Sequence, residues 1–552
     1  MSNRSKENYL VKYKYKQMRI LLLFLLVLMA GGVFAQQGED ENIKFDDVKV
    51  VKEFNANLRD FNKINIEPVL PAFDLKNRRF EYQVRAIPAK LNYEKPQIRP
   101  LALKPEPVKP VNKYYLKLGY GIPKFLKGDF SMGYKKDNSN ANLSLHYNSA
   151  DDSESVKDKR NSSAGIDLLY FNRNNELDLQ YGLNANIDGD YLYLYAVEAN
   201  KDSVYSSSQN KRRLVRGDIK LFLQKDELVN SLSDKLELRY GFLQLNTNES
   251  LENNLFLKNT LSYSINENMY LDMPLHFDYI PDDSKYIYRF NPQFVLKSKL
   301  VNFKAGADYA KSQDLSYIKP FGELSTNLFH NFFEVFLSVD NDIVNNSQFV
   351  KTYYNPFIDF DHDTIATSLT VEYAAGVRSS LEGVKLEAKA VYQDLENMLL
   401  FTVSPADARM FVPLYDNGTN LKFVANANYR VLPNILISGT LTKNFYNMEN
   451  EEKAWYKPDF TANFTTGIAM LNDKLHVKGE LFFASQSWYK DLEGKKYKLD
   501  PLFDISGTVR YRLHKSTYFF GEVNNIFAQK YQKWYQYPTY GINILAGMEI
   551  GF

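Results

Sequence analysis

Hydrophobic and polar side chains alternate with a period of two through most of the chain, from Lys113 to the last residue. The final segment shows the pattern clearly, because one face carries Ile542, Ile544, Ala546, Met548, Ile550 and Phe552. The opposite face carries Asn543, Gly547, Glu549 and Gly551, with Leu545 among them. Successive side chains of a β-strand point to opposite sides of a sheet, so each segment predicts a strand with one apolar and one polar face.

The predicted strands are about 10 to 13 residues long, whereas strands of soluble sheets average about 5 or 6. The connections between them alternate in length. Short connections lie at 172–175, 266–268, 432–434, 472–473 and 514–516. Long connections lie at 198–211, 345–364, 396–417 and 528–540. Short turns alternating with long loops are typical of transmembrane barrels, and with the strand lengths they disfavour the alternative, a soluble β-sandwich.

We therefore predict an all-β fold, a transmembrane antiparallel β-barrel of about 22 strands over residues 113–552. An even number of strands places the start of the first strand and the end of the last strand in the periplasm. The loops at 196–211 and 528–540 are then expected outside the cell, and the turn at 514–516 in the periplasm. The expected location is the cell outer membrane of a Gram-negative bacterium.

The N-terminus has a different pattern. Basic residues between Lys12 and Arg19 precede an apolar run from Ile20 to Ala30, and small residues follow up to Ala35. This order predicts a secretion signal peptide over residues 1–35. The apolar run is too short to cross a bilayer as a helix, which disfavours the alternative of a retained membrane anchor.

Residues 36–112 separate the predicted signal peptide from the predicted barrel. The first part of this region is polar and acidic, and its end contains Pro96, Pro100, Pro105, Pro107 and Pro110. Such proline density favours an extended tether over a packed core. We expect a short periplasmic or lumenal extension that ends in a Pro-rich linker.

Composition supports this organisation and excludes some functions. The chain has 40 Tyr and 38 Phe but a mean hydropathy of −0.41, which suits a barrel with a wet lumen and a lipid-facing outside. Its 68 basic and 66 acidic residues leave a formal charge of +2, so no nucleic-acid partner is indicated. The absence of Cys excludes lipoprotein anchoring, disulfides and thiolate metal sites.

The last part of the chain carries a distinctive order of residues. The run Phe-Gly-Glu-Val-Asn-Asn-Ile-Phe at 520–527 is followed by Gln529-Lys530-Tyr531, Tyr537-Pro538, Gly541 and the terminal Phe552. This order resembles the closing hairpin of TonB-dependent receptors. The resemblance implies a barrel of about 22 strands and a receptor or transport function. It also implies that Phe552 is the assembly signal read by the barrel-assembly machinery.

That family has an N-terminal plug domain, and residues 36–112 are too short to form one. The chain therefore resembles a plug-less relative of the kind common in Bacteroidetes, which leaves energised import through TonB open. Residues 46–53 resemble the short segment that engages TonB, with a plain linker strand as the alternative.

Catalytic chemistry is not indicated. None of the common hydrolase, phosphate-binding or dinucleotide-binding motifs is present, and the six His residues are scattered along the chain. Three of them, His146, His276 and His476, are expected on the polar lumen face. Asp361-His362-Asp363 is interpreted as a polar loop tip, with metal ligation as the alternative. We expect no enzyme activity, no catalytic residue, no metal site and no cofactor.

All three Trp residues of the chain precede a Tyr, in the pairs Trp455-Tyr456, Trp488-Tyr489 and Trp534-Tyr535. They fall in successive outer loops or at their bases, which a closed barrel places side by side. One interpretation is the outer aromatic girdle at headgroup level. The other is a binding site, a stacking platform for a glycan or an aromatic-anchored partner protein.

Two functions remain. The leading hypothesis is an outer-membrane receptor or transport barrel whose pore is obstructed by loops or by the N-terminal segment. The alternative is a structural or assembly subunit of an outer-membrane complex without transport activity. Expected partners are outer-membrane lipids, the barrel-assembly machinery, and a surface lipoprotein or another outer-membrane subunit.

Overall fold

The computed structural model describes residues 113–552 except 200–204, 230, 247–248, 329–331 and 382. The signal peptide predicted at 1–35 and the extension predicted at 36–112 lie outside the described residues and stay predictions. Among the described helices, none is long and apolar enough to cross a membrane.

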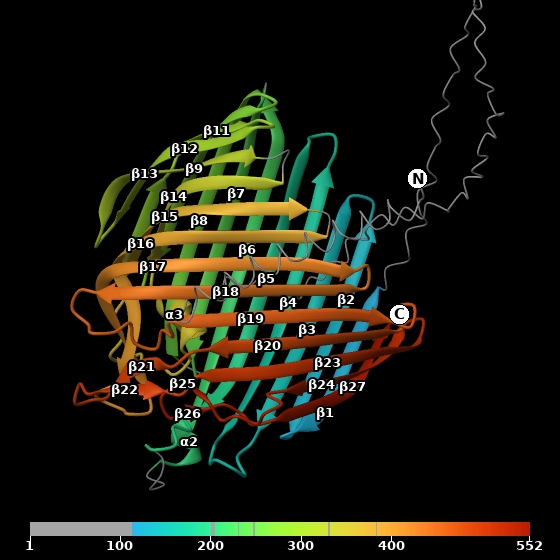
Figure 1. The fold of residues 1–552 in the computed structure, drawn as a ribbon, viewed down its shortest axis with the longest axis vertical. Coiled ribbons are helices and arrows are strands. Elements are labelled where there is room, and N and C mark those ends of the chain that lie inside the picture. The colour runs from blue at the N-terminus through green and yellow to red at the C-terminus, as the bar shows by residue number, and fades with distance from the viewer. Residues whose placement is uncertain (1–112, 200–204, 230, 247–248, 329–331, 382) are drawn as a thin grey trace, which may run out of the picture. The chain divides into compact units, whose positions relative to one another are not determined.

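The described chain consists almost entirely of long strands (Figure 1). The barrel strands are β1 (Tyr114–Ile122), β2 (Phe125–Lys136), β3 (Ser139–Asp151), β4 (Arg160–Asn174), β5 (Leu179–Tyr193), β6 (Lys211–Val229), β7 (Leu232–Leu245), β8 (Glu249–Asn266), β9 (Met269–Ile280), β10 (Lys285–Phe290), β11 (Gln293–Lys297), β12 (Val301–Ser312), β13 (Ser316–Leu328), β14 (Phe333–Asn345), β15 (Thr367–Leu381), β16 (Val384–Val403), β17 (Phe411–Leu432), β18 (Ile435–Met448), β19 (Phe460–Met470), β20 (Leu475–Ala484), β23 (Leu502–His514), β24 (Thr517–Asn524) and β27 (Asn543–Gly551). The long loops hold helices α2 (Ser207–Asn210) and α3 (Gln348–Tyr354), and the short strands β21 (Ser487–Lys490), β22 (Lys496–Leu499), β25 (Gln532–Trp534) and β26 (Tyr537–Pro538).

The main sheet is a closed ring. It contains 23 strand segments, but β10 and β11 both pair with β9 and β12 and are two parts of one strand, which leaves 22. Antiparallel pairing of β1 with β27, from Tyr115 opposite Gly551 to Ile122 opposite Ile544, closes the ring (Figure 1). The predicted fold, an antiparallel transmembrane-type barrel of about 22 strands, is confirmed.

Side chains of the last strand show how the wall is built. Ile544 and Met548 are 46% and 39% exposed on the outer face, whereas Leu545 and Glu549 are 1% and 5% exposed on the inner face. On the inner face, the Arg510 Nε donates to the Glu549 carboxylate at 2.5 Å. The wall therefore exposes apolar side chains outward and keeps charged groups paired inside, as the alternation predicts.

The two ends of the barrel differ. At one end, which we call the turn end, strands are joined by short turns such as that between His514 and Thr517. At the other, the loop end, lie α2, α3, β21–β22 and β25–β26, away from the C-terminus (Figure 1). One predicted long loop is shorter than expected, because β16 runs to Val403 and β17 begins at Phe411. The expected loop at 396–417 was wrong, since both strands extend beyond a bulge between Leu395 and Met398.

The wall also divides near the loop end of β13 and β14. Their pairing stops at Gly322 opposite Val339, and Pro320 beyond it has no N–H to donate to a ladder. From this point towards the loop end, β14 and β15 use the side chains that alternate to the outer face to pack on β10 and β12. The residues they meet on β10 and β12 face the lumen. The buried cluster comprises Ile287, Ala310, Ile343, Leu369 and Val371. The ends of β14 and β15 therefore lie inside the neighbouring strands, and the loop that they carry starts within the lumen.

Candidate functional site: a loop core across the barrel mouth

Loops from different sides of the ring meet in one buried cluster at the loop end, which we call the loop core. It comprises Ala196, Ile358, Leu399, Leu400, Phe401, Val403, Phe411, Ala454, Trp455, Tyr456, Tyr489, Leu499, Trp534 and Tyr537. Ala196 follows β5, whereas Val403 and Phe411 end β16 and begin β17, which lie nearly opposite β5 in the ring. Contacts between these residues therefore cross the mouth of the barrel.

Aromatic rings form the centre of the loop core. The ring centroid of Trp534 lies 4.8 Å from that of Tyr456 and 5.3 Å from that of Phe411. Tyr489 lies 6.2 Å from Tyr456 and 4.4 Å from Tyr535. Offset and edge contacts at these distances are favourable beyond the burial of apolar area. The three loops after β18, β20 and β24 are thus joined by stacked rings.

The structure brings the three predicted Trp-Tyr pairs together and buries most of their rings. Trp455, Tyr456, Tyr489 and Trp534 are only 3%, 6%, 8% and 8% exposed. Because these four rings contact other loop residues, neither the lipid girdle nor an open stacking platform describes them. Their first role is to hold the loops together.

Trp488 and Tyr535 are the members that keep partly exposed faces. Trp488 packs against the edge of the loop core, and the ammonium groups of Lys498 and Lys453 lie 4.7 and 5.5 Å from its ring centroid. Cations at this distance from an indole ring are favourable partners. A binding role for the aromatic pairs stays a prediction, and these two residues are the ones positioned to carry it.

Arg409, between β16 and β17, joins three loops. Its Nη1 donates to Asn210 Oδ1 at 2.7 Å, and its guanidinium lies 3.4 Å from the ring centroid of Tyr205. The Tyr537 hydroxyl donates to the Arg409 carbonyl oxygen at 2.6 Å. Nearby, Arg212 Nη1 donates to the carbonyl oxygen of Ile358 at 2.6 Å. These buried bonds, of which the two from guanidinium groups are charge-assisted, add directional contacts to the apolar cluster.

Helix α3 carries the loop between β14 and β15 to strands β6, β7 and β8, which do not pair with β14 or β15 in the ring. The carboxylate of Glu252 on β8 accepts the backbone N–H groups of Gln348 at 2.5 Å and Phe349 at 3.2 Å. Phe349 also packs on Leu214 and Leu243, which belong to β6 and β7. A carboxylate at the first turn of a helix satisfies N–H groups that have no partner within the helix. This loop therefore runs inside the ring and joins β14 and β15 to strands that do not pair with them.

A buried ion pair fixes the same loop. Lys351 Nζ lies 2.5 Å from Asp363 Oδ1 and donates to the Thr364 carbonyl oxygen at 2.7 Å, and both charged side chains are 0% exposed. Burial lowers the pKa of the Lys351 ammonium and raises the pKa of the Asp363 carboxyl. Each group thus depends on its partner to remain charged.

The sequence Asp361-His362-Asp363 does not converge on a shared point. His362 Nδ1 lies 3.0 Å from Asp359 Oδ2, while Asp363 faces Lys351. Among the described residues, no group of three or more His, Cys, Asp or Glu is arranged to hold a metal ion.

The loop before the last strand shows why one residue of the distinctive C-terminal run is an Asn. Asn525 has a positive φ of 50°, a conformation that Asn tolerates better than most residues. Its side-chain Nδ2 donates to the carbonyl oxygens of Gln529 at 2.7 Å and Tyr540 at 2.9 Å, and its Oδ1 accepts from the Gln529 N–H at 3.0 Å. This one side chain ties both ends of the loop that carries Trp534.

Comparison with known proteins supports the fold. No protein-family model and no curated protein matches the chain. The structure is similar to the FrpB iron transporter of Neisseria meningitidis, with a TM-score of 0.63, 10% identity, and coverage of 81% of this chain and 82% of that one. The ferric enterobactin receptor PfeA of Pseudomonas aeruginosa gives 0.60 at 11% identity, covering 80% of each chain. The copper transporter OprC gives 0.59 at 10% identity, covering 80% of each.

These similar structures are TonB-dependent receptors with 22-strand barrels, so the fold implied by the closing hairpin is confirmed. At such identities the likeness concerns the fold alone.

Proposed function

We propose that this protein is an outer-membrane receptor or transport barrel that lacks a full plug domain and whose outer loops hold its mouth closed. The observation that supports the proposal is the loop core, in which Ala196 from one side of the ring packs with Val403 and Phe411 from the other. In this proposal the turn end faces the periplasm and the loop end faces the outside, and the barrel carries no catalytic activity.

A closed mouth suits a barrel that admits a solute only after recognising it. A ligand that binds better to an open arrangement of the loops shifts the equilibrium towards that arrangement. Trp488 and Tyr535 offer ring faces at the loop end, and rings of this kind stack on the flat faces of a glycan. The inner wall carries both basic and acidic side chains, for example in the ion pair of Lys117 with Glu522 at 2.8 Å. Its charge therefore favours neither cations nor anions.

The alternative function is a structural or assembly subunit that conducts nothing. One observation favours it, namely that several independent sets of contacts hold the loops. The stacked rings around Trp534, the Glu252 carboxylate at α3 and the Lys351–Asp363 pair must all rearrange before the lumen opens. In a complex of this kind, a surface lipoprotein or another outer-membrane subunit is the expected partner.

Conductance of the full-length protein in planar bilayers tests the proposal. A gated transport barrel should be nearly silent as the parent and conduct when the loop core is loosened by Trp534→Ala. A second variant that lacks 36–111 but keeps the signal peptide tests whether that region adds to the obstruction. If all three proteins are silent and a stoichiometric partner copurifies with the parent, the structural-subunit function is supported and the transport function is rejected.

A further inference from the structure

The outer face of β2 to β5 changes character towards the turn end in register-matched rows. The row nearest the middle of the wall pairs Met132 with Leu143 and Leu143 with Leu168. The next row pairs Tyr134 with Ala141 and Ala141 with Tyr170. The last row before the turns is Lys136, Ser139, Asn172 and Tyr181, each paired with the next. Paired residues of antiparallel strands share a face, so these rows lie on the outside of the barrel.

This order is apolar, then aromatic, then polar. Met132 and Leu168 are 38% and 36% exposed, and Tyr134 is 57% exposed. Aromatic girdles mark the boundary between hydrocarbon and headgroups in membrane barrels. Each row is about 7 Å from the next, because two residues of a strand advance by that length. The polar row therefore lies at the depth of lipid headgroups.

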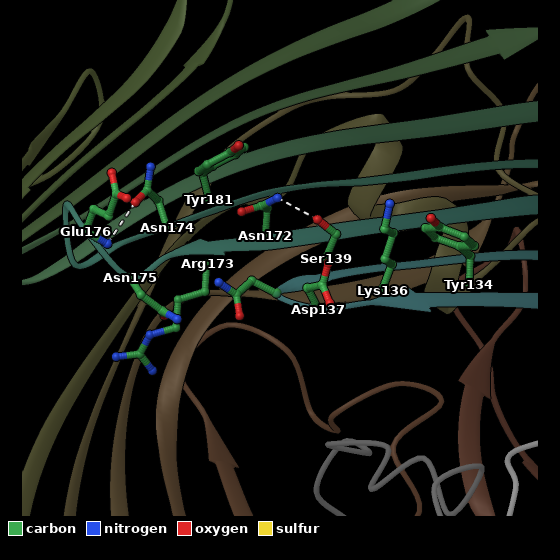
Figure 2. Close-up of a pocket in the computed structure, with 11 residues that line it drawn as sticks. Tyr134, Lys136, Asp137, Ser139, Asn172, Arg173, Asn174, Asn175, Glu176 and Tyr181 are labelled. Atoms are coloured by element: carbon green, nitrogen blue, oxygen red, sulfur yellow. Dashed lines mark hydrogen bonds between the residues drawn. The ribbon is translucent and has the colours of Figure 1, made fainter.

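A recess opens at this row. It has a volume of about 750 Å³, and its lining includes Tyr134, Lys136, Ser139, Asn172, Arg173 and Glu176. Figure 2 shows Tyr134, Lys136 and Tyr181 on one side of the strands and Arg173 on the other. Two neighbouring turns, between β2 and β3 and between β4 and β5, form its rim.

Hydrogen-bond donors converge at one part of the recess. Asn172 Nδ2 donates to Ser139 Oγ at 2.6 Å, so the Ser139 hydroxyl keeps its own proton free to donate (Figure 2). Lys136 is exposed and forms no ion pair within the described part of the chain. The Asn172 Nδ2 also donates to the Tyr170 hydroxyl at 3.3 Å, so its two protons are used and it serves to position the Ser139 hydroxyl. An ammonium and a hydroxyl on adjacent strands at one height are suited to bind a phosphate group.

A carboxylate lies at the other part of the recess. Glu176 is exposed in the β4–β5 turn, where its backbone N–H donates to Asn174 Oδ1 at 3.0 Å (Figure 2). Arg173, the other cation of the rim, already lies 3.2 Å from Asp178. The recess thus combines phosphate donors with a separate acidic group that can accept hydrogen bonds from an ammonium.

We propose that this recess binds the headgroup of a phosphatidylethanolamine molecule. Lys136 and Ser139 contact the phosphate, Glu176 accepts hydrogen bonds from the ammonium, and the acyl chains lie along the apolar row of Met132, Leu143 and Leu168. The site holds the wall at a fixed depth in the membrane leaflet on the turn side. This proposal rests on the membrane placement of the barrel and not on whether it transports a solute.

Native mass spectrometry of the full-length protein, released from detergent after titration with defined lipids, tests the site. The parent should retain phosphatidylethanolamine at least five-fold better than phosphatidylcholine, whose methylated ammonium cannot donate to Glu176. Lys136→Gln should reduce retention of both lipids and of phosphatidylglycerol. Glu176→Gln should remove only the preference for phosphatidylethanolamine. Lys515→Gln, which removes an exposed lysine from the turn between β23 and β24, is the matched control and should leave retention unchanged.

The proposal is overturned if the parent and Lys136→Gln retain equal amounts of lipid. It is also overturned if phosphatidylglycerol is preferred to phosphatidylethanolamine, because Glu176 would then not select the ammonium. Displacement of the lipid by inorganic phosphate would overturn it as well, because the acyl chains would then contribute nothing. Conductance measured on the same variants should match that of the parent, so failure of this site and failure of the transport function give different results.

Discussion

The barrel wall and the loop core are stabilised by contacts of opposite kinds. In the wall, each strand pairs with its neighbour in the chain, and only β1 and β27 meet across the whole length of the sequence. In the loop core, bonds join residues far apart in sequence, for example the Tyr195 hydroxyl to the Pro538 carbonyl oxygen at 3.1 Å. The wall needs a repeated pattern, whereas the loop core needs particular side chains at particular places. Changes to each region should therefore have different consequences.

The largest effect is expected where the wall closes. Phe552 stacks on Tyr114 with ring centroids 5.3 Å apart, and the two residues exchange backbone hydrogen bonds of 2.9 and 3.0 Å. Phe552→Asp places a charge on the outer face of the closing pair, and a ring that fails to close exposes strand edges. Outer-membrane abundance should fall about ten-fold or more, measured by immunoblot of membrane fractions, if closure controls assembly.

Phe552→Tyr is the matched control for that experiment, because it keeps the ring and should restore normal abundance. Normal abundance and normal heat-modifiable migration of Phe552→Asp would show that the terminal aromatic residue is not the assembly signal.

A smaller effect, confined to the loop core, is expected for Trp534→Ala. Removing a buried Trp costs about 3 to 5 kcal/mol. Within the wall, the rings of Trp534 contact only Phe401 and Phe411, at the loop ends of β16 and β17, among the described ring pairs. The variant should therefore assemble at parental levels while its loops become sensitive to added protease. Trp488→Ala removes a half-buried ring and should change protease sensitivity much less. Equal sensitivity of both variants would show that the buried rings do not hold the loops together.

The wall was predictable from sequence because alternation is a local signal. A strand in a membrane barrel repeats apolar and polar positions whatever its partners are, and Asn-containing turns separate the strands. The count of 22 strands and the inward position of Glu549 both follow from that pattern.

The loop-end strand extensions were missed because they have two buried faces. Leu399, Leu400 and Phe401 are consecutive apolar residues with exposures of 9%, 0% and 3%, so no alternation marks them as a strand. A short continuous apolar run is the signal that predicts such a strand, and it was available at this point of the sequence.

The polar fastenings of the loop core had no local signal at all. Arg409, Arg212 and Glu252 look like ordinary charged residues, and the partners that they bind in other loops lie 96 to 199 positions away along the chain. The Trp-Tyr pairs were recognisable by composition, but whether their rings are exposed depends on how these distant loops pack.

For Lys351→Met we expect an effect at the lower end of the range given above for Trp534→Ala. Breaking a buried ion pair from one side costs about 3 kcal/mol or more. Here the remaining carboxyl can respond by taking up a proton, and burial already raises the pKa of Asp363. A raised folded-state pKa gives stability that is present below the unfolded pKa and lost as pH rises through the folded pKa. The loops of the variant should therefore be more protease-sensitive at pH 8 than at pH 5.

The double variant Lys351→Met with Asp363→Leu removes both charges and should lose this pH dependence, with protease sensitivity close to that of the parent. If the single variant shows the same sensitivity at both pH values, the Lys351–Asp363 pair does not fasten the loop.

The smallest structural effect is expected for single Cys substitutions at the two ends of the barrel. These substitutions also test which end faces the outside of the cell. Ser207 is exposed on α2 at the loop end, and Ser516 lies in the turn between β23 and β24 at the turn end. Neither side chain belongs to the loop core, and a change of Ser to Cys at such sites should alter stability by less than about 0.5 kcal/mol. Because the chain has no native Cys, an impermeant thiol reagent reports only the introduced residue. On intact cells Cys at 207 should be labelled and Cys at 516 should not, whereas both should react after the outer membrane is disrupted. Labelling of position 516 on intact cells would place the turn end outside, so that the loop core would guard the periplasmic mouth and the lipid recess would face the outer leaflet.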